Sequence, residues 1–339
     1  MIKKAGRWWG SWVVELGRLG MQRPRDKKTS YISLWREFLV FNSAARKFGR
    51  RLGKPGMNVS TVFPERYVDN ERPQRHVSPI PKEEEGFDLE RYRRVKEFVG
   101  LEEVTKLDFL LMLFAEVLGT FLLVFIGCAS CITWITAKSP SVLHIAFTFG
   151  LAVASLAQVL GPISGCHVNP AVSFGLMLSG NCSFLKTVSY IICQCCGAIA
   201  GSAVLKLMLP TEIETANSLG STTLGAGITA GQGVVMEGII TFLLVLVVHA
   251  VTDPKRTDVK GWAPLAIGLT ISAAHMAAVP LTGSSMNPAR TLGPDVVRGE
   301  FSNWWVYWVG PLVGGGMAGV VYRMGLRSNR EDDEGSYDF

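Results

Sequence analysis

The stretches His167-Val168-Asn169-Pro170-Ala171-Val172 and Met286-Asn287-Pro288-Ala289-Arg290-Thr291 share the triplet Asn-Pro-Ala. A proline at the first position of a helix, with an asparagine as the N-cap before it, is a typical helix start. Both triplets lie in Gly- and Ser-rich breaks within apolar sequence, so they predict two helix N-termini at membrane depth. Two positive helix ends and two side-chain amides at one place would suit a pore for a small polar molecule and would disfavour cations.

The sequence around these motifs is that of a polytopic membrane protein. From Phe109 onward, apolar runs alternate with short polar breaks, and each run is near the ~20 residues that cross about 30 Å of hydrocarbon. Six spans are expected, at Phe109–Ile135, Val142–Leu160, Phe184–Leu207, Gln232–Val251, Trp262–Val279 and Trp304–Met324.

This membrane core contains an internal repeat. Residues Glu116–Val124 (EVLGTFLLV) resemble Glu237–Val245 (EGIITFLLV), and Gly150 and Gly268 precede their Asn-Pro-Ala triplets by the same interval. Each half has three spans, with its triplet between the second and the third, over about 107–207 and about 232–326. An odd number of spans inverts the second copy, so the two triplets would enter from opposite faces and meet near the midplane. The predicted fold class is an all-α membrane protein with six transmembrane helices plus two re-entrant half-helices in two inverted three-span repeats.

Charge is divided unevenly along the chain. Residues 1–106 hold 23 of the 34 Lys and Arg residues and 14 of the 28 Asp and Glu residues. We expect them to form a polar, basic and largely disordered cytoplasmic tail, with a targeting segment or an isoform-specific extension as alternatives. The loop with Lys255, Arg256 and Lys260 would share the cytoplasmic side. Residues 327–339 would form a short cytoplasmic C-terminal tail, and the expected location is the plasma membrane.

The spans carry no motif for catalysis. The chain has seven cysteines, but Cys193-Gln194-Cys195-Cys196 lacks the paired spacing and the histidines of a zinc site. Gly314-Gly315-Gly316 lies inside a span with no strand before it, so it is not a phosphate-binding loop. We therefore expect a protein that is not an enzyme and that has no cofactor, no metal and no nucleic-acid partner.

Together these features resemble the aquaporin (major intrinsic protein) family over about residues 107–325. The resemblance rests on the two Asn-Pro-Ala motifs within inverted three-span repeats, each with its own Glu-x-x-x-Thr. It implies a right-handed helix bundle, a homotetramer with one pore in each subunit, and water and the lipid bilayer as partners. It also implies a central pore constriction formed by Asn169, Pro170, Ala171, Asn287, Pro288 and Ala289.

The same resemblance implies a second constriction, an aromatic and arginine filter toward the extracellular side. Its residues would be Phe149, His275, Ser284 and Arg290. The bulky ring and the histidine resemble the water-selective branch, and the arginine would repel cations. Asp295 departs from that branch, which usually has a small alanine there, and also from the glycerol channels, which usually have a basic residue.

Four further residues are candidates for the site. The resemblance places His167 and Cys166 at the cytoplasmic pore mouth. Glu116 and Glu237 are intramembrane acids, and such an acid can belong to a proton relay. Because each repeat has its own copy, we favour a structural role in which each carboxylate accepts hydrogen bonds from the backbone of its loop and braces the half-helix.

The function that these residues favour is a passive water channel, which moves water along osmotic gradients while it excludes protons and ions. The alternative is a channel that also passes glycerol, urea, ammonia or hydrogen peroxide. An ion-coupled secondary transporter ranks lower, because the two breaks carry neutral amides and an arginine in place of an acidic ion site. A non-conducting membrane scaffold ranks lower still, because the set of filter residues is complete.

Overall fold

The computed structural model describes residues 82–134, 138–256 and 261–327. Its contacts divide the chain into Met1–Ser78 and Pro79–Phe339, and only the second unit contains described residues. Most of the expected N-terminal tail, residues 1–81, and most of the expected C-terminal tail, residues 328–339, therefore lie outside the described residues.

The described part of the chain is all helical and contains no strand. Among the described residues, five helices are long and apolar enough to cross a membrane, namely α5 (Leu107–Ala129), α6 (Val142–Ser164), α8 (Phe184–Met208), α10 (Ala230–Thr252) and α11 (Ala263–Thr282). The sixth predicted span is α13 (Val306–Val321), which has 16 residues and continues into a 5-residue π-helical turn, Tyr322–Leu326. Two short helices, α7 (Pro170–Leu178) and α12 (Pro288–Arg298), begin at the prolines of the two motifs. The predicted fold class is confirmed.

Local side-chain chemistry accounts for the ends of several helices. The Ser141 side chain caps α6 by accepting from His144 N at 3.1 Å, and Thr229 and Gln232 form a reciprocal capping box at the start of α10. The first span was predicted to run to Ile135, but α5 ends at Ala129. After Ala129 the backbone N–H groups of Cys131 and Ile132 donate to Cys128 O and Ala129 O, three residues back, so the chain leaves the helix through tighter turns.

Besides a 3₁₀ turn at Ser218–Gly220, three helices of the described residues were not predicted. Two of them, α3 (Lys82–Val99) and α4 (Leu101–Val104), lie in the segment expected to form the tail. The other is the short α9 (Thr211–Asn217), in the loop between α8 and α10. In α3 an ion pair between Arg93 and Glu97, one helical turn apart, is the kind of contact that supports an exposed helix.

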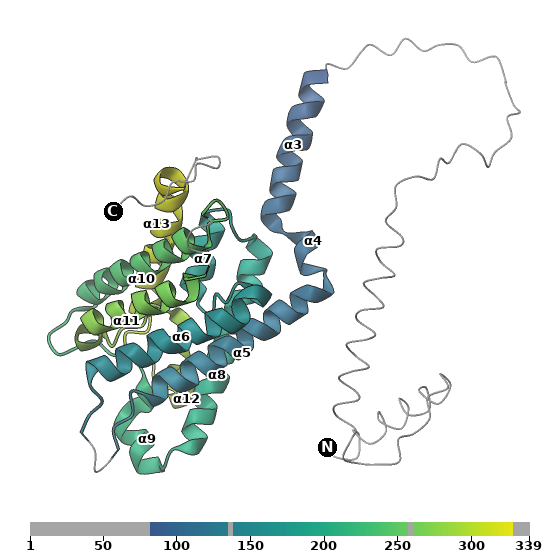
Figure 1. Ribbon diagram of the computed structural model, residues 1–339. Helices are drawn as coiled ribbons and strands as arrows, with labels where there is room; N and C mark the ends of the chain where they lie inside the picture. Colours follow the sequence, from purple (N-terminus) through teal and green to yellow (C-terminus); the bar gives the residue numbers. More distant parts are fainter. Residues whose placement is uncertain (1–81, 135–137, 257–260, 328–339) are drawn as a thin grey trace, which may run out of the picture. The chain divides into compact units, whose positions relative to one another are not determined.

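The helices pack in repeat-related pairs. Helix α5 packs on α8, α10 packs on α13, and α6 crosses α11 between the two halves (Figure 1). Each short helix packs mainly against the last span of the other repeat, α7 against α13 and α12 against α8. The buried apolar side chains between the spans form the core, which includes Leu123, Val153, Leu244 and Ile271.

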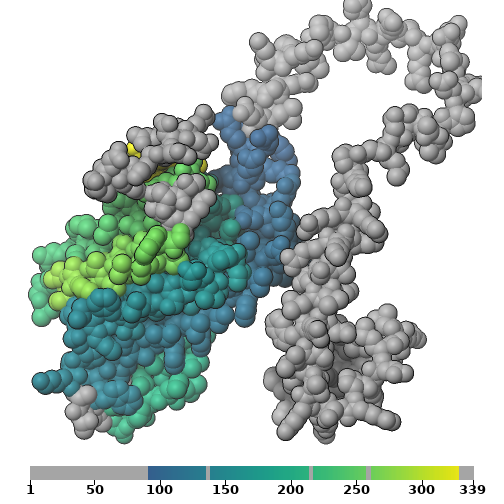
Figure 2. Space-filling view, in the orientation of Figure 1, coloured from purple at the N-terminus to yellow at the C-terminus, as the bar shows by residue number. Residues whose placement is uncertain are grey.

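The outer faces of the spans are apolar and exposed. On α6 and α11, which form part of the teal and green surface in Figure 2, these side chains are Leu143, Leu151, Val159, Leu265 and Leu269. An apolar exterior of this kind is suited to a lipid bilayer, where hydrocarbon and not water contacts these side chains.

The crossing of α6 and α11 depends on two glycines that occupy equivalent repeat positions. A Cβ built on Gly150 would lie 2.4 Å from Gly268 O and 2.0 Å from Ser272 Oγ. A Cβ built on Gly268 would in turn lie 2.4 Å from Gly150 O. Small residues allow two helix backbones to approach this closely in a membrane.

We expect the substitution Gly150→Ala to destabilise the fold by about 1–3 kcal/mol, because the added methyl group has no room at the crossing. Thermal unfolding of the purified protein in detergent would measure the loss. Gly161→Ala on the same helix is the matched control, because nothing lies within 4 Å of a Cβ at Gly161. Equal unfolding temperatures for the two variants would contradict this account of the crossing.

Candidate functional site

The two short helices meet with their N-termini at the centre of the bundle. Asn169 Nδ2 donates to Met286 O at 2.8 Å, and Asn287 Nδ2 donates to Val168 O at 2.9 Å. Each side-chain oxygen caps its own helix, because it accepts from the backbone N–H of Ala171 or of Ala289 at 2.8 and 3.0 Å. An amide nitrogen carries two N–H groups, so each asparagine keeps one donor besides the bond that fixes its orientation.

The loops that lead into these helices have an irregular backbone with the same pattern in both repeats. Positive φ angles of 48° and 43° occur at Cys166 and Val168, and angles of 52° and 54° occur at Ser284 and Met286. A non-glycine residue in this region costs roughly 1–3 kcal/mol, so the surrounding structure must hold it there. The equivalent angles show that both loops meet the same constraint.

Glu116 supplies that constraint in the first repeat. Its side chain is fully buried, and its oxygens accept from the backbone N–H groups of His167 and Val168 at 2.9 and 2.7 Å. Ser164 Oγ and Gln194 Nε2 each donate to the same carboxylate at 2.7 Å. Four donors therefore converge on one buried acid.

Glu237 occupies the equivalent place in the second repeat. This fully buried carboxylate accepts from the backbone N–H groups of Ser285 and Met286 at 2.9 and 2.7 Å, and from Thr282 Oγ1 at 2.7 Å. In both repeats the acid faces the loop backbone rather than another titratable side chain. Bracing therefore stays the interpretation that we favour, although Glu116 is also linked through Gln194 and Ser173 to His167 of the cavity lining.

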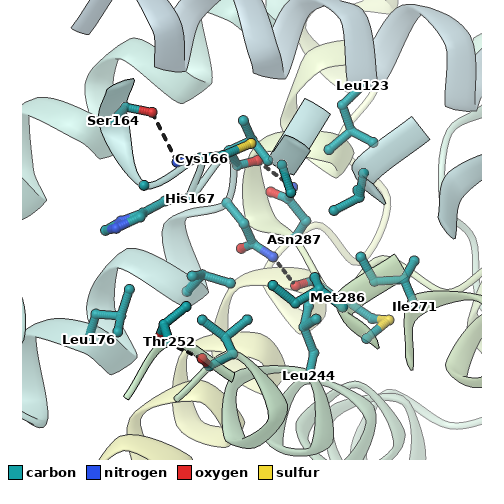
Figure 3. A pocket seen from close by; sticks show the side chains of 18 of the residues that line it. Leu123, Ser164, Cys166, His167, Leu176, Leu244, Thr252, Ile271, Met286 and Asn287 are labelled. Atoms are coloured by element: carbon teal, nitrogen blue, oxygen red, sulfur yellow. Dashed lines mark hydrogen bonds between the residues drawn. The ribbon is translucent and has the colours of Figure 1, made fainter. Parts of the chain in front are cut away.

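A cavity of about 490 Å³ passes the junction of the two helices (Figure 3). His167 and Cys166 of the first repeat and Asn287 and Met286 of the second lie around it. Leu123, Leu176, Leu244 and Ile271 give it an apolar wall. One end has Phe149, His275 and Arg290, which we call the Arg290 end, and the other end, which we call the Lys186 end, has Asn181, Lys186 and Thr252.

The Arg290 end brings together three of the four residues expected in the filter. The rings of Phe149 and His275 stack with centroids 4.7 Å apart, and the guanidinium carbon of Arg290 lies 5.0 Å from the Phe149 centroid. All three residues are at most 3% exposed. Ser284 is also buried, but it is not part of the cavity lining. Within the described structure, three buried polar atoms near here have no hydrogen-bond partner: His275 Nε2, Arg290 Nε and Ser284 Oγ.

Sequence reasoning missed the loop that holds Arg290. Its Nη1 donates to Gly220 O at 2.7 Å, and its Nη1 and Nη2 lie 3.6 and 3.9 Å from the sulfurs of Cys128 and Cys131. Gly220 has a φ of +65°, and a Cβ there would lie 2.8 Å from Cys128 O. Only a glycine fits this turn without strain. No pattern in the sequence pairs this loop with the arginine.

Sequence reasoning also missed the Lys186 end. Lys186 Nζ donates to Glu103 Oε1 at 2.8 Å and lies 5.5 Å from the centroid of the Tyr190 ring. Ser183 Oγ donates to Glu103 Oε2 at 2.9 Å. Burial by itself would raise the pKa of the Glu103 carboxyl, but the bonds from Lys186 and Ser183 outweigh it and lower that pKa below its ordinary value. The carboxylate therefore stays charged at neutral pH and holds the lysine.

Comparison with known proteins assigns the chain to a family. The family model described as Major intrinsic protein matches residues 103–322. Aquaporin-5 of Sus scrofa is 44% identical over 222 residues, which cover 65% of this chain and 83% of that protein. Aquaporin-4 of Mus musculus is 44% identical over 211 residues, which cover 61% of this chain and 65% of that protein. The crystal structure of the aquaglyceroporin from Plasmodium falciparum aligns with a TM-score of 0.57 and 26% identity, over 64% of this chain and 97% of that one.

Replacing Glu116 with glutamine tests whether the acid braces the loop. The NH₂ group of the glutamine would replace a carboxylate oxygen that accepts hydrogen bonds, and it would face a donor that it cannot pair with. We therefore expect the free energy of unfolding to fall by about 1–3 kcal/mol. Thermal unfolding would measure it, and Glu300→Gln, a change at an exposed acid, is the control. A stable variant with altered proton leak into liposomes would instead indicate a relay.

Cys166 offers a chemical probe of the cavity, because it is half-buried in the lining at a position beside His167. We expect a mercurial to slow water flux through the original chain, because the bound metal would obstruct the passage. The variant Cys166→Ser should lose most of this block. Cys196→Ser, which removes an exposed thiol outside the cavity lining, should keep it. A block that persists in Cys166→Ser would place the reactive thiol elsewhere.

Proposed function

This chain belongs to the major intrinsic protein family, and we propose that it is a passive water channel that excludes protons and ions. The proposal rests on one observation. At one end of a cavity that passes between Asn169 and Asn287, the Phe149 ring stacks on His275 and lies beside the Arg290 guanidinium. The chain thus offers polar donors in a narrow passage whose remaining wall is apolar.

The centre of the passage would act on the orientation of the water. Two helices direct their N-termini at it, and each brings a partial positive charge. The remaining N–H groups of Asn169 and Asn287 would donate to a passing water oxygen. A water that accepts from both amides cannot also accept from the next water in the file, so a proton wire would be interrupted here.

The Arg290 end would select by size and charge. Phe149 and His275 occupy the space that a carbon chain would need, and the free Nε2 of His275 and Nε of Arg290 offer polar contacts that suit water. The fixed charge of Arg290 would repel cations. A solved relative that is named an aquaglyceroporin keeps glycerol as the second candidate permeant, and urea, ammonia and hydrogen peroxide remain with it.

Ion-coupled transport has less support. Coupling would need a free acid or an ion site of unwound carbonyls at the midplane. The oxygens of Glu116 and Glu237 are instead engaged by donors of their own loops. The carbonyls of Val168 and Met286 each accept from an asparagine amide.

The placement of the chain in its membrane is part of the proposal. Lys255 and Arg256 follow α10, and the segment before α5 is basic, so the positive-inside bias would put both termini in the cytoplasm. The Lys186 end would then be the cytoplasmic mouth and the Arg290 end the extracellular one. We further propose a homotetramer in the plasma membrane, with residues 1–106 and 327–339 as its cytoplasmic tails.

Stopped-flow light scattering of proteoliposomes tests the proposed function. Fast shrinkage against an impermeant osmolyte, with no re-swelling in a glycerol gradient, is the expected result. In Arg290→Val we expect glycerol permeability to rise at least about tenfold, the equivalent of ~1.4 kcal/mol in the barrier. Proton flux should rise as well, because the fixed charge is gone. Empty liposomes and Arg323→Val, a change at an exposed arginine outside the cavity lining, are the controls.

Rapid re-swelling of the original chain in glycerol would move the assignment to the second candidate. Unchanged selectivity in Arg290→Val would contradict the role given to the arginine.

A further inference from the structure

Asp295 is a buried acid to which neither the motifs nor the proposed pore gives a role. It lies on α12, the helix that begins at Pro288 and carries Arg290, and it is only 4% exposed. The cavity lining does not include it. Burying a carboxylate costs free energy unless hydrogen-bond partners stabilise it, so the partner of Asp295 indicates the role of this residue.

That partner is the loop that holds Arg290. The hydroxyl of Ser221 donates to Asp295 Oδ1. The next loop residue, Thr222, shares a hydrogen bond of 2.7 Å with Thr291, one helical turn before Asp295. Two successive loop residues are therefore joined to two successive turns of one face of α12.

The residue before this pair completes the arrangement. Gly220 presents its carbonyl oxygen to Arg290 Nη1 at 2.7 Å. Three consecutive loop residues, 220–222, therefore contact α12 at Arg290, Asp295 and Thr291. Because Ser221 is covalently next to Gly220, a bond that fixes Ser221 also restricts where the Gly220 carbonyl can lie.

The loop needs such an anchor. Ser218, Leu219 and Gly220 all have positive φ angles, of 51°, 50° and 65°. Leu219 is fully buried. Strained backbone of this kind persists only where side-chain contacts hold it in place.

We propose that Asp295 is a positioning residue for solute selectivity. It accepts the Ser221 hydroxyl, fixes the 218–222 turn against α12, and thereby holds the Gly220 carbonyl that keeps the Arg290 guanidinium beside Phe149. The inference rests on the proposed filter and deepens it. The neutral acceptor of an asparagine would serve the same purpose, so the hydrogen bond and not the charge is the working feature.

Two measurements on the full chain test this proposal. The first is the ratio of glycerol to water permeability in proteoliposomes. We expect Asp295→Ala and Ser221→Ala each to raise it at least about fivefold, which corresponds to the ~1 kcal/mol of one hydrogen bond. The double variant should exceed neither single variant, because both remove the same bond. Asp295→Asn should keep the original ratio.

The second measurement is hydrogen exchange of the backbone amides in the 218–222 segment. Exchange there should quicken in Asp295→Ala and Ser221→Ala and stay slow in Asp295→Asn. Glu300→Gln, a change at an exposed acid near the end of the same helix, should alter neither readout. Ser221 is only half-buried, so its variant remains informative if Asp295→Ala does not fold.

The outcomes separate this inference from the proposed function. The inference would be overturned if both alanine variants kept the amide exchange rates of the 218–222 segment and the permeability ratio of the original chain. Arg290→Val could still show in that case that the filter operates. Loss of selectivity in Asp295→Asn would also overturn it, because charge would then be the working feature. Glycerol flux through the original chain would defeat the water-selective assignment, and the exchange data would still decide whether Asp295 anchors the loop.

Discussion

A buried carboxylate in each repeat is the interaction on which the rest of this structure depends. Backbone that is not helical can lie at membrane depth only if its polar groups are satisfied within the protein. Glu116 and Glu237 satisfy the N–H groups that the two loops would otherwise leave unpaired. Because the loops are fixed, the two short helices begin at a defined place, and the asparagine amides meet the carbonyls of the opposite loop.

The two repeats share this framework but differ at a few positions that face the cavity. Three residues after Asn287 stands Arg290, and three residues after Asn169 stands Val172. Two residues before the asparagines, the first repeat has His167 and the second has Ser285. A symmetric scaffold thus gives the cavity a charged, aromatic end and a different, lysine-bearing end. The chemical difference between the two ends comes from side-chain substitution on equivalent backbone.

Most of the fold was predictable because its signals are local or repeated. The helices α7 and α12 begin at Pro170 and Pro288 as the motifs predict, and α6 begins at the expected Val142. The sequence also placed Phe149, His275 and Arg290 in one group through the family resemblance. It did not reveal Gly220, Ser221 and Asp295 as neighbours, because a loop without periodicity carries no sign of the helix it touches. The pair of Glu103 and Lys186 was missed because it joins two helices, α4 and α8, that are far apart in the sequence and share no pattern. Helix α3 was missed because a charged segment resembles disorder.

Each short helix packs on the last span of the opposite repeat, α7 on α13 and α12 on α8. This exchange has a consequence for biogenesis. The first repeat leaves the ribosome long before α13 exists, so α7 cannot complete its packing until the last span has been made. The order in which the spans are inserted therefore differs from the order in which they can finish packing, and neither half of the chain can reach its final structure by itself.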